Sequence, residues 1–146
     1  VSSAFQNNAK IPSKYTCDGE NVSPPLEFLD VPNNAKSLVL IVDDPDAPAK
    51  VWVHWVVYNI NPKTTKVDKD SIPEGGIEGT TDFGKPGYGG PCPPSGVHRY
   101  FFKLYALNSI LDLPQKATKQ ILKDKMQGHI IHKAELVGLY SRLLRR

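Results

Sequence analysis

The chain has 146 residues, 40% of them hydrophobic and 23% charged, which is typical of one ordinary globular domain spanning residues 1–146. Its formal net charge of +3 is too small to favour nucleic-acid binding on charge alone. No apolar run reaches the ~18 residues of a membrane helix, so no stable membrane insertion is expected.

The first part of the chain predicts strands separated by turns. A short strand is expected within residues 2–14, and another over residues 26–28 after a turn-rich loop. Residues 37–42 form a continuous aliphatic and β-branched run, which predicts a central strand buried on both faces. Two prolines and three carboxylates within residues 43–48 then end this strand.

Two longer strands are predicted next, over residues 51–60 and 98–107. In the first, strict alternation places His54 on one face with Trp52, Val56 and Tyr58, opposite Val53, Trp55 and Val57. In the second, alternation places one set of residues on a common face: His98, Tyr100, Phe102 and Leu104. Between the two strands lies a long loop rich in glycine and proline, which is of a kind that is usually functional or disordered.

The last third of the chain changes period and predicts two helices. Apolar residues recur at helical spacing over residues 117–122, and Gly128 is a suitable helix stop. A second amphipathic helix is predicted over residues 130–140, with Arg142, Arg145 and Arg146 at its end. The predicted fold is a mostly antiparallel β domain closed by two C-terminal helices.

Three side chains are the main candidates for chemistry. Asp44 ends a buried strand, where it would either orient a histidine at a pocket mouth or serve only as a turn residue. His54 lies in mid-strand and is either a core histidine or a pocket histidine. His98 directly follows the loop and shares a face with Tyr100, so that a ligand touching one can touch the other. The shared face of His98 and Tyr100 favours a pocket at this position.

The loop before His98 is expected to have a fixed backbone that presents amide groups and the histidine to a ligand. Its glycines suit close backbone approach, and successive N–H groups can form an anion-binding concavity. No nucleotide-binding motif is present. The two cysteines, Cys17 and Cys92, are either reduced thiols or a single bridge.

The signals for catalysis are weak. A nucleophile at Cys92 paired with His98 is disfavoured by the surrounding prolines and by the lack of a third orienting group. A metal site built from two histidines and Asp44 lacks short ligand spacing. We therefore expect no enzymatic turnover, no metal ion and no cofactor.

Three motifs occur in order along the chain: Asp44–Pro48, then His54-Trp55, then Gly89–Pro91 through His98–Tyr100. Together they resemble the phosphatidylethanolamine-binding protein family, in its short bacterial and archaeal Raf-kinase-inhibitor-like branch. The resemblance covers nearly the whole chain. It implies an antiparallel Greek-key β-sandwich with C-terminal α-helices, and it favours a cis Ala47–Pro48 bond.

The resemblance also implies a cavity for small anions such as phosphate, phosphate esters or acetate. Its ligand-binding residues would be Asp44, Pro48, His54, Gly90, Pro91, His98 and Tyr100. Gly90 would offer its backbone N–H, while Pro48 and Pro91 would shape the wall. The implied function is binding of an anion or phospholipid headgroup, coupled to a protein target such as a kinase.

An alternative function, also implied by the resemblance, is inhibition of a serine protease or carboxypeptidase through an exposed loop. The same resemblance favours a homodimer. Residues 1–3 have neither the charge nor the apolar core of a signal peptide, so a cytoplasmic location is expected. A periplasmic or secreted location is expected instead if a leader has been removed.

Overall fold

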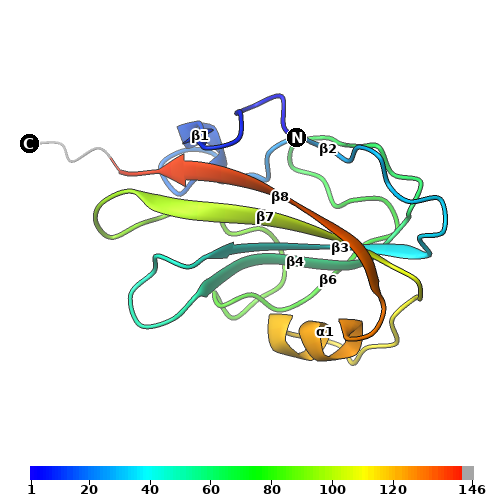
Figure 1. Ribbon diagram of the computed structural model, residues 1–146. Coiled ribbons are helices and arrows are strands. Elements are labelled where there is room, and N and C mark those ends of the chain that lie inside the picture. Colours follow the sequence, from blue (N-terminus) through cyan, green and yellow to red (C-terminus); the bar gives the residue numbers. More distant parts are fainter. Residues whose placement is uncertain (143–146) are drawn as a thin grey trace, which may run out of the picture.

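The computed structural model describes residues 1–142, and a six-stranded sheet with the order β1-β8-β7-β3-β4-β6 forms its centre (Figure 1). The strands of this sheet are β1 (Ala9–Lys10), β3 (Ser37–Asp44), β4 (Trp52–Ile60), β6 (Ile77–Glu78), β7 (His98–Leu107) and β8 (Ile130–Tyr140). A second, two-stranded sheet pairs β2 (Leu26–Glu27) with β5 (Lys66–Val67), and a 3₁₀ turn spans Ser13–Tyr15. The mainly β prediction is confirmed, but the larger sheet is mixed, because β1 runs parallel to β8.

β3 is the central strand of the fold. It pairs with β4 on one side and β7 on the other, and all of its residues are buried. Leu38, Leu40 and Val42 pack into the apolar cluster on one face of the sheet, and Val39 and Ile41 into the cluster on the other face. The prediction of a strand buried on both faces is therefore confirmed.

The alternation of β4 breaks at His54. Val42 lies opposite Trp55, but the next residue, Asp43, lies opposite Val53, so that His54 is the extra residue of a β-bulge. Trp55 consequently packs in the cluster on the face of Tyr100, while Val56 joins the cluster of Val53 on the other face. The strict alternation predicted for this strand is wrong beyond His54.

One of the two predicted C-terminal helices is present. It is α1 (Lys119–Met126), which begins at Thr118, whose hydroxyl accepts a hydrogen bond from the N–H of Ile121. Leu122 and Met126 pack in the cluster on one face of the large sheet, and Gly128 follows with a φ of +80°. In the part of the chain that the structure describes, no helix has the length and apolar character needed to cross a membrane.

The second predicted helix is wrong, because residues 130–140 form β8. This strand pairs with β7 from His98 opposite Tyr140 to Leu107 opposite Ile130. Its buried positions, Leu136, Gly138 and Tyr140, recur every second residue. The long edge of β7 offers backbone partners along the whole segment, and this tertiary pairing outweighs the local apolar spacing. Arg145 and Arg146, expected at the end of that helix, lie outside the described residues.

The long loop between β6 and β7 is tied to the N-terminal part of the chain. A disulfide joins Cys17 to Cys92, which decides between the two alternatives for these residues. The hydroxyl of Tyr88 donates to the carbonyl of Tyr15 over 2.7 Å, and the N–H of Cys17 donates to the carbonyl of Pro91 over 3.1 Å. The loop is thus anchored at several points along its length.

The turn after β3 differs from one expectation. Residues 1–142 contain no cis peptide bond, so the predicted cis Ala47–Pro48 bond is wrong. Ala49, which follows Pro48, has a positive φ of +74°. The carboxylate of Asp44 accepts a hydrogen bond from the N–H of Asp46 over 2.8 Å, a local contact that shapes the turn.

Candidate functional site

A cavity of about 290 Å³ lies where three strand ends meet. Because β3 is antiparallel to both neighbours, its C-terminal end lies beside the beginnings of β4 and β7. The long loop supplies the remaining wall. The lining residues of this histidine cavity are Asp44, Ala47, Pro48, Trp52, His54, Phe83, Cys92, Pro93, Pro94, His98 and Tyr100.

Most of the residues predicted for the site line the cavity. The structure brings together five of them: Asp44, Pro48, His54, His98 and Tyr100. Gly90 and Pro91 are not among the lining residues. The N–H of Gly90 donates to the side-chain oxygen of Asn21 over 2.8 Å and is therefore engaged within the chain. A Cβ at Gly90 would lie 2.4 Å from the carbonyl oxygen of Tyr15, so that glycine is needed for close backbone approach.

Asp44 and His98 form a buried pair. Nδ1 of His98 lies 2.6 Å from Oδ2 of Asp44, and the two side chains are only 8% and 4% exposed. A carboxylate oxygen accepts, so Nδ1 of His98 carries the hydrogen of this contact. Asp44 therefore fixes the orientation of the His98 ring, as expected for a carboxylate placed beside a pocket histidine.

His54 is held by the backbone of the long loop. Its Nδ1 lies 2.7 Å from the carbonyl oxygen of Gly89, and its Nε2 is buried without a hydrogen-bond partner among the described residues. The ring packs edge-on against Phe83 and Tyr100, with centroid distances of 5.4 and 5.2 Å. Burial lowers the pKa of His54, although the Gly89 carbonyl and the Asp44 carboxylate act in the opposite direction.

Tyr100 carries the second unpartnered polar atom of the cavity. Its hydroxyl is buried and has no hydrogen-bond partner within residues 1–142. Burial raises the pKa of Tyr100, and the nearby charge of Asp44 raises it further. The phenol consequently remains protonated at neutral pH and can donate a hydrogen bond.

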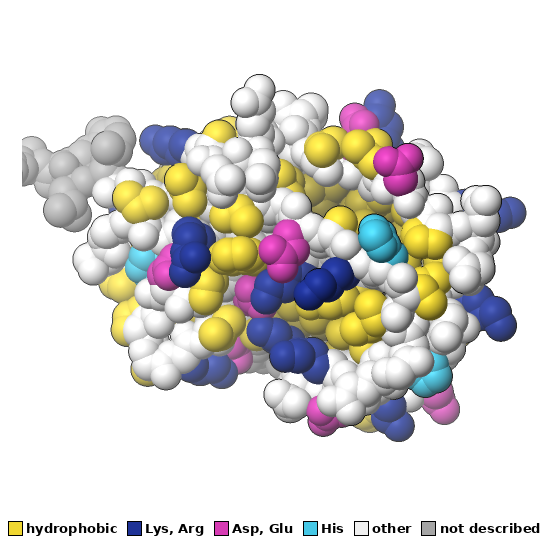
Figure 2. Space-filling view, in the orientation of Figure 1, with side chains coloured by type: hydrophobic (Ala, Val, Ile, Leu, Met, Phe, Trp, Pro, Cys, Tyr) yellow, Lys and Arg dark blue, Asp and Glu magenta, His cyan; other side chains and the backbone are white. Residues whose placement is uncertain are grey.

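Positive charge lies outside the histidine cavity. Among the described residues that line it, none is lysine or arginine. The nearby Arg99 is exposed and binds Asp46 through two contacts of 2.9 Å, and this interaction lowers the pKa of Asp46 to about 2. Figure 2 shows basic side chains grouped near the centre of one face with acidic ones beside them. Among the charged contacts of the described chain, the buried carboxylate of Asp43 accepts from Lys103 and Lys119.

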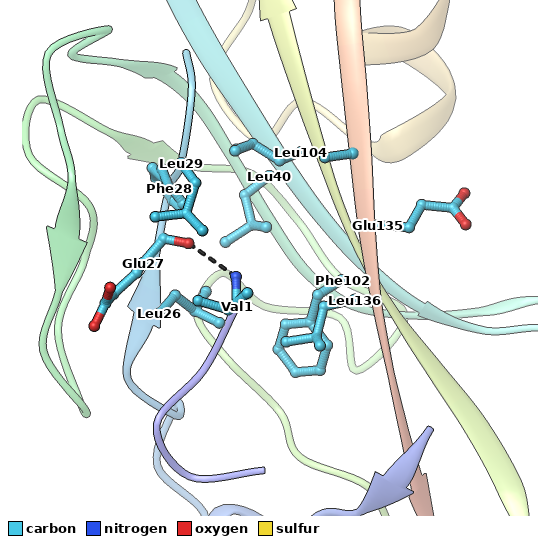
Figure 3. A pocket seen from close by; sticks show the side chains of 11 residues that line it. Val1, Leu26, Glu27, Phe28, Leu29, Leu40, Phe102, Leu104, Glu135 and Leu136 are labelled. Atoms are coloured by element: carbon cyan, nitrogen blue, oxygen red, sulfur yellow. Dashed lines mark hydrogen bonds between the residues drawn. The ribbon is translucent and has the colours of Figure 1, made fainter. Parts of the chain in front are cut away.

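A second, smaller cavity of about 200 Å³ has a different character (Figure 3). Its walls are mainly leucine and phenylalanine side chains gathered around Val1, whose amino group donates to the carbonyl of Glu27 over 3.0 Å. None of the unpartnered buried polar atoms of the described chain belongs to its lining residues. The histidine cavity is therefore the better candidate for a site with specific polar recognition.

The apolar wall of the histidine cavity was not predicted. Trp52 and Phe83 pack edge-to-face with their centroids 5.6 Å apart, and Cys92, Pro93 and Pro94 complete the wall. Because Trp52 lies two residues before His54, the alternation of a strand predicts that both side chains lie on one face. The sequence contains no comparable signal for Phe83, because its position depends on the path of the loop.

Comparisons with known proteins agree with this architecture. The family model described as "Phosphatidylethanolamine-binding protein" matches residues 1–141. A UPF0098 protein of Methanothermobacter thermautotrophicus is 54% identical over 144 residues, which cover 95% of each chain. The crystal structure of a phosphatidylethanolamine-binding protein homolog, CT736 of Chlamydia trachomatis, has a TM-score of 0.93 and 44% identity, covering 97% of this chain and 95% of that one. The structure of YbcL from E. coli has a TM-score of 0.90 and 30% identity, with coverage of 98% and 97%.

Proposed function

Because the chain belongs to the phosphatidylethanolamine-binding protein family, we propose that its histidine cavity binds a small phosphate ester of the kind that forms a phospholipid headgroup. The observation that carries this proposal is the pair of unpartnered buried atoms, Nε2 of His54 and the hydroxyl of Tyr100. Leaving a buried polar atom unpaired costs about 1–3 kcal/mol, and a polar ligand removes that cost. The other two such side-chain atoms, of Asp43 and Thr64, belong to residues that do not line the cavity.

The chemistry of the cavity suits an ester better than a bare ion. The hydroxyl of Tyr100 donates to an oxygen of the anion, and His98 adds a ring nitrogen whose direction Asp44 fixes. A charge-assisted hydrogen bond contributes about 1.5–3 kcal/mol. Trp52 and Phe83 offer an apolar surface for the organic part of the ester. With no lysine or arginine among the described lining residues, we expect the affinity to be weak.

The same residues support binding without turnover. Cys92 is the one lining residue whose side chain would carry a thiol, and its sulfur is held in the disulfide with Cys17. The alternative of a cysteine nucleophile activated by His98 therefore loses its nucleophile. Asp44 is engaged with His98 and with the N–H of Asp46, so that both of its oxygens already accept hydrogen bonds.

The test is a titration with methyl phosphate followed by NMR of the histidine rings. We expect the signals of His54 and His98 to shift, while those of His129, a half-buried histidine bonded to Asn108 outside the cavity, stay unchanged. The variant Tyr100→Phe should weaken binding by about fivefold to tenfold, because it removes only the donor. Tyr105→Phe is the matched control, since Tyr105 packs with the cluster on the opposite face of β7. Unchanged signals at both cavity histidines, or equal effects of the two variants, would contradict the proposal.

A further inference from the structure

The hydrogen-bond polarity of the histidine cavity restricts what can bind there. The carbonyl oxygen of Gly89 can only accept, so the nitrogen 2.7 Å away, Nδ1 of His54, is the donor of that contact. In the neutral ring the other nitrogen, Nε2, then carries a lone pair and acts as an acceptor. The ligand atom that satisfies Nε2 must therefore bring a hydrogen with it.

The charges around His54 also limit the ligand. Asp44, His98 and Tyr100 line the cavity together with His54, and the centroid of the Tyr100 ring lies 5.2 Å from that of His54. The carboxylate of Asp43, elsewhere on β3, is engaged by two lysines. Phe83, from the loop, contributes no charge. Burial lowers the pKa of His54, which keeps the ring neutral near pH 7. A dianion would meet the Asp44 carboxylate, which is paired with His98, and the neutral ring of His54, so the desolvation of its second charge would have little compensation.

We propose that the cavity selects an oxyanion that still carries a proton, namely the monoanionic form of a phosphomonoester. Its P–OH group donates to Nε2 of His54, and one of its anionic oxygens accepts from the hydroxyl of Tyr100. Each of the two unpartnered atoms thereby gains a partner of the right polarity. This inference rests on the proposed function, since it concerns the protonation state of the ligand of that same site.

A matched pair of ligands isolates the proton. Methyl phosphate at about pH 5 is a monoanion with a P–OH group, because its second pKa is about 6. Methyl sulfate has the same charge and nearly the same shape but no proton to donate. By calorimetry or NMR titration, we expect methyl phosphate to bind at least about tenfold more tightly. We also expect its binding to weaken by about tenfold per pH unit above pH 6, as the monoanion disappears.

The variant His54→Phe tests the acceptor directly. It should bring the ratio of the two affinities close to one, whereas the control His129→Phe should leave that ratio unchanged. If His54→Phe does not fold, the ¹⁵N shift of Nε2 in the unaltered protein gives the same information, because the ring should remain neutral when methyl phosphate is bound. An imidazolium signal in the complex would overturn the inference, since the proton would then reside on the protein.

The outcomes separate the two proposals. Equal binding of the two esters, or tighter binding of methyl sulfate, would overturn the selectivity for a protonated ligand and leave the proposed function intact. Absence of binding by either ester would overturn both. A preference for methyl phosphate that persists in His54→Phe would show that the selectivity arises elsewhere, and it would overturn the assignment to His54.

Discussion

Removal of the disulfide between Cys17 and Cys92 should lower the free energy of unfolding by an amount that depends on how far apart the two cysteines lie in the sequence. The two residues are 75 positions apart, and the chain-entropy relation for a loop of this length gives about 4.5 kcal/mol at 25 °C. For 146 residues, the entropy of unfolding near the melting temperature is about 0.3 kcal/mol/K. The double variant Cys17→Ser/Cys92→Ser should therefore melt about 15 °C lower.

The same change should also affect the histidine cavity. The disulfide ties the cavity wall to the N-terminal segment, beside the hydrogen bond from the N–H of Cys17 to the carbonyl of Pro91. The double variant should consequently bind methyl phosphate more weakly as well as unfold at lower urea.

The assay is urea unfolding of the oxidised protein, of the reduced protein and of the double variant, with ligand titration on the same samples. Reduction and the double substitution should lower the free energy of unfolding by the same amount. The unfolding free energy should also depend more steeply on urea, because the unfolded chain without the disulfide is more expanded. A loss below about 1 kcal/mol would refute the entropic reasoning. Unchanged ligand affinity would refute the role assigned to the disulfide in the cavity wall.

Three further predictions concern single residues. Burial lowers the pKa of His54 below its unfolded value of 6.5, so the stability contributed by the neutral ring is complete above pH 6.5 and is lost as the pH falls toward the lowered value. Urea midpoints measured from about pH 7.5 to about pH 5.5 should therefore fall more for the unaltered protein than for His54→Gln. Parallel profiles of the two proteins would argue against a buried neutral ring. Arg99→Ala should raise the pKa of Asp46 from about 2 toward 3.8, which an NMR pH titration of the Asp46 carboxyl carbon would measure. A pKa that stays near 2 would mean that the Arg99 guanidinium does not cause the lowering. Gly138→Ala should lower the free energy of unfolding by about 1–3 kcal/mol, measured by thermal unfolding, because the added Cβ would lie 2.4 Å from the side chain of Ile11. An unchanged stability would show that β1 can move away from β8.

The parts of the fold that follow from short-range patterns were predictable from the sequence. The aliphatic run of residues 37–42 identified a strand buried on both faces, and the alternation over residues 98–107 gave β7 with His98 and Tyr100 on one face. Both signals are local, because they reflect the period at which side chains meet the core. The same kind of signal failed over residues 130–140, where helical spacing was present but the free edge of β7 was the stronger partner.

The candidate site shows the same division. Asp44 and His98 were recognisable from their places at a strand end and beside the glycine-rich loop, whereas the mid-strand position of His54 fitted a core histidine as well as a pocket histidine. The structure brings all three to one cavity. The role predicted for Gly90 differed, because its N–H is engaged by Asn21, a residue 69 positions away. A contact across such a separation leaves no periodic trace in the sequence.

The sequence by itself determined which residues are apolar, the strands over residues 37–42, 51–60 and 98–107, and which polar side chains lie on those strands or at their ends. Only the tertiary structure decided the polarity of the cavity. A carbonyl from the long loop fixes the proton of His54 on Nδ1, and a bulge in β4 turns Trp55 to the same side of the sheet as Tyr100. Both effects depend on contacts between distant segments: the loop that carries Gly89 is held in place by the disulfide and by the Tyr88 hydroxyl, and the bulge is set by pairing with β3.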